Sequence, residues 1–187
     1  MFAVEEAPGP SLVTERLRLR PIRRTDLDPL DEAIRETLPE LVKWLPWAHP
    51  SRTRTDTRRY IRQARIARAR GTAYEFIVMH EETEQVLGVM GLHRVDWSRR
   101  SAGLGYWIRR SAWGHGFAPE SAACVVEHAF RSLGLNRLEA HVALDNHGSQ
   151  RVVEKLGFQR EGVARELEII GGQPLDHIQY GLLRREV

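Results

Sequence analysis

The chain has little of what secreted, membrane-spanning or metal-binding proteins need. Cys124 is its one cysteine, so no internal disulfide can form and a reducing compartment is expected. The N-terminus, Met-Phe-Ala-Val-Glu-Glu, is short and acidic, unlike a signal peptide. No apolar run approaches the roughly 20 residues that cross a bilayer. The eight histidines lack paired ligand spacing and cysteine partners, so no metal is expected. We therefore expect a cytoplasmic protein.

Lysine is also scarce, because Lys43 and Lys155 are the only lysines among 28 basic residues. Arginine carries the positive charge, which 25 acidic residues reduce to a net +3. With 187 residues, 42% of them hydrophobic, the chain fits one domain with a proper core. We expect a single domain over residues 1–187, in which residues 1–11 form a loose arm.

The apolar pattern switches between strand and helix periods along the chain. Strands are expected at 17–22, 73–80, 86–95, 101–108, 137–144, 158–170 and 176–184, and helices at 25–38, 56–69, 119–133 and 147–156. This order predicts a mixed α/β (α+β) fold with one layer of sheet and helices packed on it. No internal repeat or linker divides the chain.

Residues 104–119 combine a short apolar strand, a loop with two glycines and a helix that would begin at Pro119. Glycines let the backbone approach a ligand, and the first N–H groups of a helix are unpaired. A pyrophosphate would fit at this place. The loop is neither a Walker loop, which needs Gly-Lys-Ser/Thr, nor a dinucleotide fingerprint, which needs a third glycine.

A second block lies downstream, Asn146-His-Gly-Ser-Gln-Arg-Val-Val-Glu-Lys-Leu-Gly-Phe158. With Gly-Tyr-Trp, Trp-Gly-His-Gly-Phe-Ala and Pro-Glu in the first block, and Trp44-Leu-Pro-Trp47 upstream, it resembles the GNAT superfamily of N-acetyltransferases. The closer resemblance is to the RimJ/RimL branch, which acetylates protein N-termini, over about residues 12–185. One departure is Trp113, where the superfamily usually has Gln or Arg.

The resemblance implies the GNAT fold, a mixed, mostly antiparallel twisted sheet that splays between two central strands and is flanked by helices. It also implies acetyl-CoA as cosubstrate, with the pantetheine arm in the V-shaped gap. Backbone N–H groups of Gly114, His115, Gly116, Phe117 and Ala118 would hold the pyrophosphate. Ile108 and Arg110 would offer main-chain bonds to pantetheine, as would Asn146 by its side chain. Asn146 also suits the cap of the helix at 147–156, and both roles can hold.

For the chemistry, the resemblance places Ser149 near the sulfur, where a hydroxyl can donate to a developing thiolate. Whether Ser149 gives up a proton or only hydrogen-bonds stays open. Glu168 matches a proposed base, and the alternative is a solvated glutamate on a strand. Further assignments are weaker. Glu166, on the same strand face as Glu168, and Glu75 are alternative bases. Asp176 is expected to be structural and Cys124 to be a packing residue, and the resemblance implies that backbone N–H groups near Trp107 and Ile108 stabilise the oxyanion.

Residues 52–70 contain eight arginines and one acidic residue, Asp56. They predict either an amphipathic helix with a solvated arginine face or a surface that attracts an acidic partner. The RimL-like substrate is an acidic ribosomal stalk protein, and Trp44, Trp47 and Tyr60 could line the acceptor channel or belong to the core. Nucleic acid is a weaker alternative, since no nucleic-acid motif accompanies the arginines.

The first hypothesis is therefore acetylation of a protein N-terminal α-amine. The alternatives are a small amine acceptor, such as an antibiotic, polyamine or amino acid, and a non-catalytic acyl-CoA-binding module. The sequence leaves open the acceptor, the acyl-chain preference and the oligomeric state, although a homodimer is compatible with it.

Overall fold

The computed structural model describes residues 9–187, so most of the predicted arm over residues 1–11 lies outside the described residues. An eight-stranded sheet runs through this part of the chain in the order β1-β2-β3-β4-β5-β6-β8-β7. Its strands are β1 (Leu12–Val13), β2 (Leu17–Pro21), β3 (Tyr74–His80), β4 (Val86–Asp96), β5 (Ser101–Ile108), β6 (Arg137–Ala143), β7 (Gln159–Ile170) and β8 (Gln173–Leu183). Its helices are α1 (Leu27–Leu41), α2 (Arg54–Ala69), α3 (Phe117–Arg131) and α4 (His147–Lys155).

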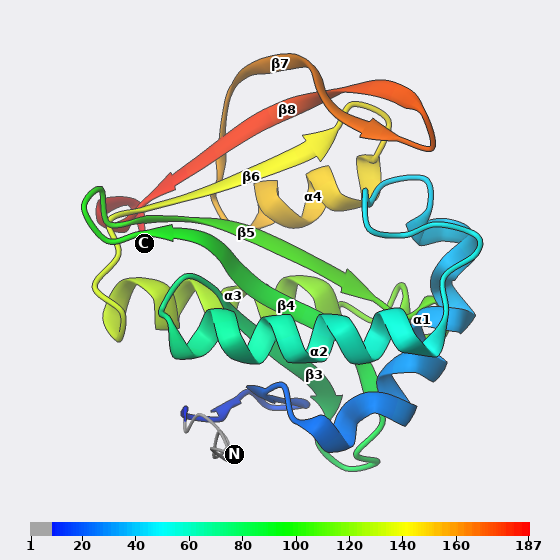
Figure 1. Cartoon of the computed structure of the whole chain (residues 1–187). Coiled ribbons are helices and arrows are strands. Elements are labelled where there is room, and N and C mark those ends of the chain that lie inside the picture. The colour runs from blue at the N-terminus through cyan, green and yellow to red at the C-terminus, as the bar shows by residue number, and fades with distance from the viewer. Residues whose placement is uncertain (1–8) are drawn as a thin grey trace.

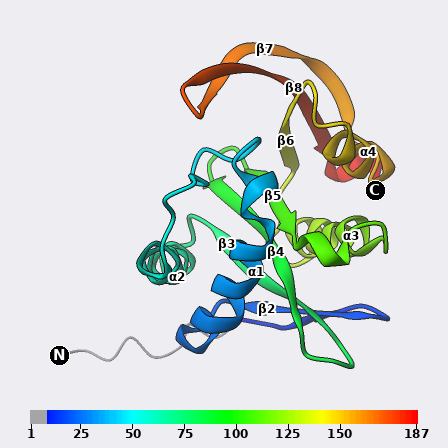
Figure 2. The ribbon, with the colours of Figure 1, turned by 90° about the vertical axis from the view of Figure 1, so that its right-hand side faces the viewer.

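Neighbouring strands are antiparallel except β5 and β6, which run parallel. The β5–β6 ladder covers Ser101 to Gly103 only, while on its other edge β5 stays paired with β4 as far as Ile108. The two strands separate beyond Gly103, and the gap is visible between β5 and β6 (Figures 1 and 2). The predicted mixed sheet, splayed between two central strands, is confirmed.

Strand alternation divides the core between the two faces of the sheet. Helices α1 and α2 cover one face and α3 lies on the other (Figure 2). Phe76 and Val78 belong to the cluster that contains the apolar face of α3, whereas Ile77, between them, packs with Ile34 and Ile61 of α1 and α2. Among residues 9–187, no helix is long and apolar enough to cross a membrane.

Helix α3 begins at Phe117 rather than at the predicted Pro119. Gly116 precedes it with φ of 79°, a left-handed conformation that glycine adopts without strain. The chain therefore turns into the helix as soon as the glycine loop ends. The first free N–H groups of the helix come directly after that loop.

Buried Arg109 ties the end of β5 to α1. Its Nε donates to Glu36 Oε2 at 2.8 Å, and Nη2 donates to Glu36 and also to Glu32 Oε1 at 3.1 Å. Glu36 Oε1 in turn accepts from the N–H of Ser111 at 2.8 Å. This pairing lowers the pKa of Glu36 from 4.5 to about 2, because the hydrogen bond from Arg109 outweighs burial.

Replacing Glu36→Gln is expected to lower the free energy of unfolding near neutral pH. The folded-state pKa is depressed, so the contribution of Glu36 is present above its unfolded pKa of about 4.3. It is lost as the pH falls toward about 2, and the difference between variant and wild type should shrink over that range. Urea unfolding followed by circular dichroism measures it.

The matched control is Glu32→Gln, since Glu32 bonds the same guanidinium but its side chain is 65% exposed. It should change stability little. A Glu36→Gln difference that stays constant from pH 7 to pH 2 would contradict the assignment.

Candidate functional site

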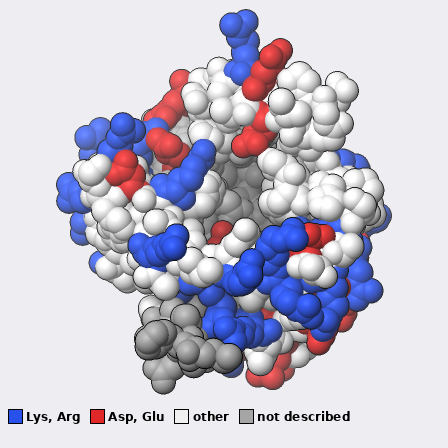
Figure 3. Space-filling model, in the orientation of Figure 1, with Lys and Arg blue, Asp and Glu red and all other residues white. Residues whose placement is uncertain are grey.

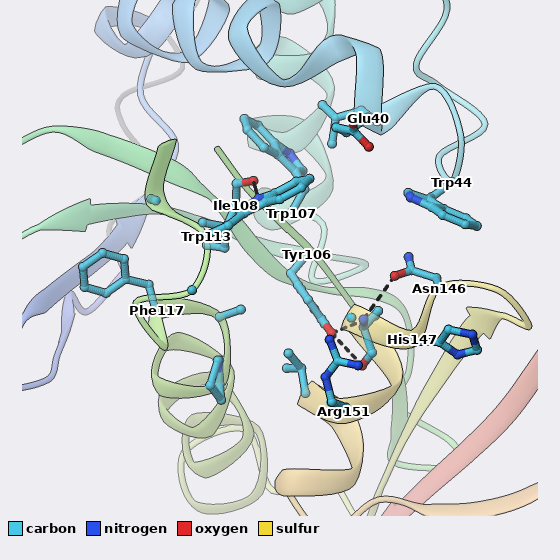
Figure 4. A pocket seen from close by; sticks show the side chains of 18 of the residues that line it. Glu40, Trp44, Tyr106, Trp107, Ile108, Trp113, Phe117, Asn146, His147 and Arg151 are labelled. Carbon is cyan, nitrogen blue, oxygen red and sulfur yellow. Dashed lines mark hydrogen bonds between the residues drawn. The ribbon is translucent and has the colours of Figure 1, made fainter. Parts of the chain in front are cut away.

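A cleft of 670 Å³ opens where β5 and β6 separate. The end of β5, the loop after it, the start of α3, the end of α1 and the first turns of α4 form its walls (Figure 4). Most predicted cofactor residues line it, namely Ile108, Gly114, Gly116, Phe117, Ala118, Asn146 and Ser149, whereas Arg110 and His115 do not. The structure therefore brings the two sequence blocks together around one cavity.

The glycine loop presents unpaired backbone donors to this cleft. Gly114 and Gly116 have φ of 80° and 79°, a conformation that other residues rarely adopt. Within residues 9–187, the N–H groups from Gly114 to Ala118 donate to no protein acceptor. Together with the positive end of the α3 dipole they can bind an anion.

Arg16, the residue before β2, holds this loop in place. Its Nη1 donates to the carbonyl oxygen of His115 at 3.0 Å, and its Nε donates to Glu120 Oε2 at 2.8 Å. The guanidinium also lies 4.7 Å from the centre of the Phe117 ring. Burial raises the pKa of Glu120, but hydrogen bonds from Thr14 and Arg16 outweigh it and lower the pKa overall. No sequence pattern marks Arg16, which is one of many arginines and lies far from the loop along the chain.

The backbone after β5 is partly engaged by the protein itself. Trp113, 48% exposed, donates from Nε1 to the carbonyl oxygen of Ile108 at 2.7 Å (Figure 4). The N–H of Arg110 donates to Thr37 Oγ1 at 3.1 Å. A ligand that pairs with the backbone of Ile108 must therefore share the Ile108 carbonyl with Trp113. The backbone N–H of Arg110 is already bonded to Thr37.

Ser149 sits at the start of α4 and faces β5. Asn146 caps this helix as predicted, accepting from the N–H of Ser149 at 3.1 Å. The hydroxyl of Tyr106 lies 2.8 Å from Ser149 Oγ and 3.2 Å from its carbonyl oxygen (Figure 4). Burial raises the pKa of Tyr106 to about 12, although the bond to Ser149 lowers it. Tyr106 is thus a neutral hydroxyl beside Ser149, a role that we did not predict although the Gly-Tyr-Trp motif contains it.

The predicted acceptor residues are separated by the structure. Trp44 lines the cleft, but Trp47 and Tyr60 do not. The centre of the Trp47 ring lies 6.4 Å from the centre of the Trp107 ring and 4.7 Å from the guanidinium carbon of Arg52. The hydroxyl of Tyr60, on α2, donates to Glu75 Oε2, on β3, at 3.0 Å. Burial raises the pKa of Glu75, against the bond from Tyr60 and the charge of Arg68.

Glu168 is half-buried on β7 and lies outside the cleft lining. A bulge precedes it, and within the bulge Glu166 has φ of 51°. The expectation that Glu166 shares the face of Glu168 by simple alternation is therefore wrong, because the bulge interrupts the pleat. The N–H of Glu166 donates to Asp176 Oδ1 at 2.8 Å, so Asp176 has the structural role that we predicted.

Two remaining predictions concern cysteine and metal. Cys124 is half-buried on α3, and burial raises the pKa of its thiol, as suits a packing residue. Across residues 9–187, no three His, Cys, Asp or Glu side chains are grouped to hold a metal ion.

Comparison with known proteins identifies the family. The family model of the acetyltransferase (GNAT) domain matches residues 16–159. The uncharacterized N-acetyltransferase p20 of Bacillus licheniformis is 34% identical over 94% of this chain and 97% of its own. The ribosomal-protein-serine acetyltransferase of Escherichia coli is 26% identical over 84% of this chain and 87% of its own.

Solved structures agree with these relatives. A putative ribosomal-protein-serine acetyltransferase from Vibrio cholerae has a TM-score of 0.80 at 27% identity, covering 94% of this chain and 98% of its own. RimL, a ribosomal L7/L12 alpha-N-protein acetyltransferase in complex with coenzyme A, shares the fold with a TM-score of 0.88 at 21% identity, covering 93% and 98%. The resemblance inferred from the two sequence blocks is confirmed. The chain belongs to the GNAT acetyltransferase family, in its RimJ/RimL-like branch, and is an N-acetyltransferase.

Proposed function

We propose that this protein transfers an acetyl group from acetyl-CoA directly to a primary amine, and that the amine is a protein N-terminus of the ribosomal-protein type. The observation that carries the proposal is the row of free N–H groups at the start of α3, beside the unpaired edge of β5. Such a row binds phosphate, and an open strand edge binds an extended amide chain. Coenzyme A carries both a pyrophosphate and an amide-bearing arm.

The residues of the cleft fit this cosubstrate. Gly114 to Ala118 would hold the pyrophosphate, and Ile108 and Asn146 would bond the pantetheine arm. Arg151 and Lys155, also in the lining, add positive charge on the α4 side. The bound thioester supplies the activated acetyl group.

The transfer needs two proton movements. An ammonium acceptor first loses a proton, and its nitrogen lone pair then forms a bond to the thioester carbon. As the C–S bond breaks, its electron pair stays on sulfur, and the second amine proton leaves nitrogen as the thiolate becomes a thiol. We assign removal of the first proton to Glu168 and hydrogen bonding to the thiolate to Ser149, which Tyr106 positions at 2.8 Å.

A small-molecule amine is the alternative acceptor. The non-catalytic binding module is not retained, because the chain belongs to an acetyltransferase family and Ser149 lines the cleft that would hold the cosubstrate.

The face that carries α1 and α2 supports an acidic acceptor. On it, basic side chains surround a central hollow, with fewer acidic ones among them (Figure 3). Arg58 and Arg62 of α2 are exposed, while Arg54 is paired with Asp28 at 2.5 Å. Arg68 instead packs on the core, 4.6 Å from the centre of the Phe76 ring. Part of the arginine run therefore packs on the core and part faces solvent, and we assign attraction of an acidic acceptor to the solvent-facing part.

The proposed reaction predicts thiol release that depends on an acceptor. The purified protein should release coenzyme A from acetyl-CoA in the presence of peptides with a free N-terminus and not with N-terminally blocked copies. Acidic peptides should react best, and their KM should rise with salt. Reaction with free small amines alone would favour the alternative acceptor, and no acceptor-dependent release would refute the proposal.

Substitution of Gly116→Ala should weaken acetyl-CoA binding. A side chain at φ of 79° costs about 1–2 kcal/mol, so the loop shifts away from its binding geometry. We expect the Kd for acetyl-CoA, measured by calorimetry, to rise about tenfold. Gly134→Ala is the matched control, since Gly134 has φ of 69° and lies outside the cleft; an added Cβ meets nothing within 4 Å at Gly134 and only Arg16 Nη2, at 3.6 Å, at Gly116. Equal effects of the two variants would contradict the loop assignment.

Substitution of Ser149→Ala should lower the turnover number about tenfold or more while acetyl-CoA still binds. Tyr106→Phe keeps the serine hydroxyl and removes only its partner, so its loss should be smaller. Steady-state kinetics with calorimetry separates turnover from binding. Unchanged turnover in Ser149→Ala would exclude Ser149 from the mechanism.

A further inference from the structure

A second cavity of 100 Å³ lies behind the cleft, and we call it the inner chamber. It shares five lining residues with the cleft, Trp44, Leu45, Tyr106, Asn146 and Ser149. The two cavities therefore meet at Ser149. If the cleft holds the cosubstrate as proposed, the inner chamber is next to the thioester and on the way to the acceptor.

Three titratable side chains from the described part of the chain line the inner chamber, and none of them is a carboxylate. They are Tyr106, His141 from β6 and His177 from β8. Tyr106 stays protonated at neutral pH, with a pKa of about 12, so it cannot accept a proton as a neutral phenol. Glu168 does not reach the lining. A proton that leaves an amine in this chamber therefore meets an imidazole first.

His177 is the better placed of the two imidazoles. It is 4% exposed, and its Nδ1 lies 3.1 Å from the carbonyl oxygen of Leu175. A carbonyl only accepts, so Nδ1 carries the hydrogen and Nε2 keeps the lone pair. Within residues 9–187, Nε2 has no hydrogen-bond partner. A buried imidazole with a fixed tautomer and an unused lone pair is equipped to receive a proton.

His141 is less available. Its Nδ1 lies 3.5 Å from Nη2 of Arg94, and a guanidinium only donates. Burial, followed by the charge of Arg94, lowers the pKa of His141. The same two causes, in the same order, lower the pKa of His93 on β4 to about 4. Burial and Arg94 thus disfavour the protonated forms of His93 and His141, and Arg94 donates to the Nδ1 lone pair of His141.

We propose that Nε2 of His177 takes the first proton from the acceptor ammonium. This inference rests on the proposed acetyl transfer and replaces one part of it, since the first proton goes to His177 instead of directly to Glu168. The N–H bond of the ammonium breaks, its electron pair stays on nitrogen for attack on the thioester carbon, and the proton forms a new N–H bond on Nε2. The imidazolium later returns the proton to solvent. Glu168 then acts through space, as it does on His141, whose pKa its charge raises.

The titratable groups that line the chamber with His177 are His141 from β6 and Tyr106 from β5. The charges that act on His141 are those of Arg94 from β4, Glu139 from β6, His177 itself and Glu168 from β7. On the strand of His177, Asp176 bonds the N–H of Glu166. Both signs of charge are present, so no single neighbour decides the protonation of the chamber.

The decisive variant is His177→Asn, whose amide can still donate to Leu175 but cannot accept the proton. We expect kcat/KM for an N-terminal peptide to fall about tenfold or more at pH 7. The loss should close above about pH 9, because an α-amine with a pKa of about 7.7–8.0 is then already neutral. The Kd for acetyl-CoA should not change. Kinetics from pH 6 to pH 10 measures this.

Two further variants sharpen the result. His141→Asn should reduce kcat/KM less, because Arg94 occupies its lone pair. Glu168→Gln should reduce kcat/KM but keep the wild-type dependence of kcat/KM on pH if Glu168 only assists. If Glu168 were the direct base, Glu168→Gln would change that pH dependence and His177→Asn would behave as wild type, which would overturn the inference. A His177→Asn loss that is equal at every pH would overturn it as well.

A measurement on the unmodified protein covers the case in which the variants fail to fold. Nitrogen-15 NMR of the imidazoles should show that the neutral form of His177 carries its hydrogen on Nδ1. A neutral form with the hydrogen on Nε2 would contradict the proposal. Failure of the proposed function has a different signature, since the wild-type protein would then release no acceptor-dependent thiol at any pH.

Discussion

The separation of β5 from β6 after Gly103 is the constraint on which the other features depend. A strand edge left without a partner leaves backbone donors and acceptors that need hydrogen bonds from elsewhere. One of them, the carbonyl of Ile108, is already taken by Trp113. The rest of the edge is open to a ligand with its own amides. The cleft, the inner chamber and Ser149 all lie along this one gap.

Arginine keeps the surroundings of the gap in place. Arg109 joins the end of β5 to α1 through two glutamates, and Arg16 fixes the glycine loop by holding the carbonyl of His115. In each case a forked donor reaches a carboxylate and a backbone carbonyl together, which a lysine ammonium does less well. The near absence of lysine is thus consistent with a structure whose long-range ties need planar, multiple donors.

The sequence predicted the features that short segments encode. The succession of strands and helices along the chain, the glycine loop and the Asn146 cap each follow from neighbouring residues, and the family resemblance supplied the splayed sheet. The missed contacts join distant residues, such as Arg16 with Glu120, Tyr106 with Ser149 and the chamber that contains His177. No local pattern encodes such pairs. The bulge at Glu166 was missed for a similar reason, because its N–H bonds a carboxylate, Asp176, on another strand.

In the proposed reaction the two proton tasks fall to different kinds of group. The hydroxyls of Tyr106 and Ser149 line both cavities, and the high pKa of Tyr106 leaves it able to donate a hydrogen bond but unable to take a proton from an ammonium. The imidazoles line the inner chamber only, and burial, followed by the charge of Arg94, lowers the pKa of His141. A nearby carboxylate would not serve as well in contact with the amine, because it would form an ion pair with the ammonium and favour the protonated form. A neutral imidazole accepts the proton without first stabilising it, and Glu168 at a greater distance can then favour the charge that develops.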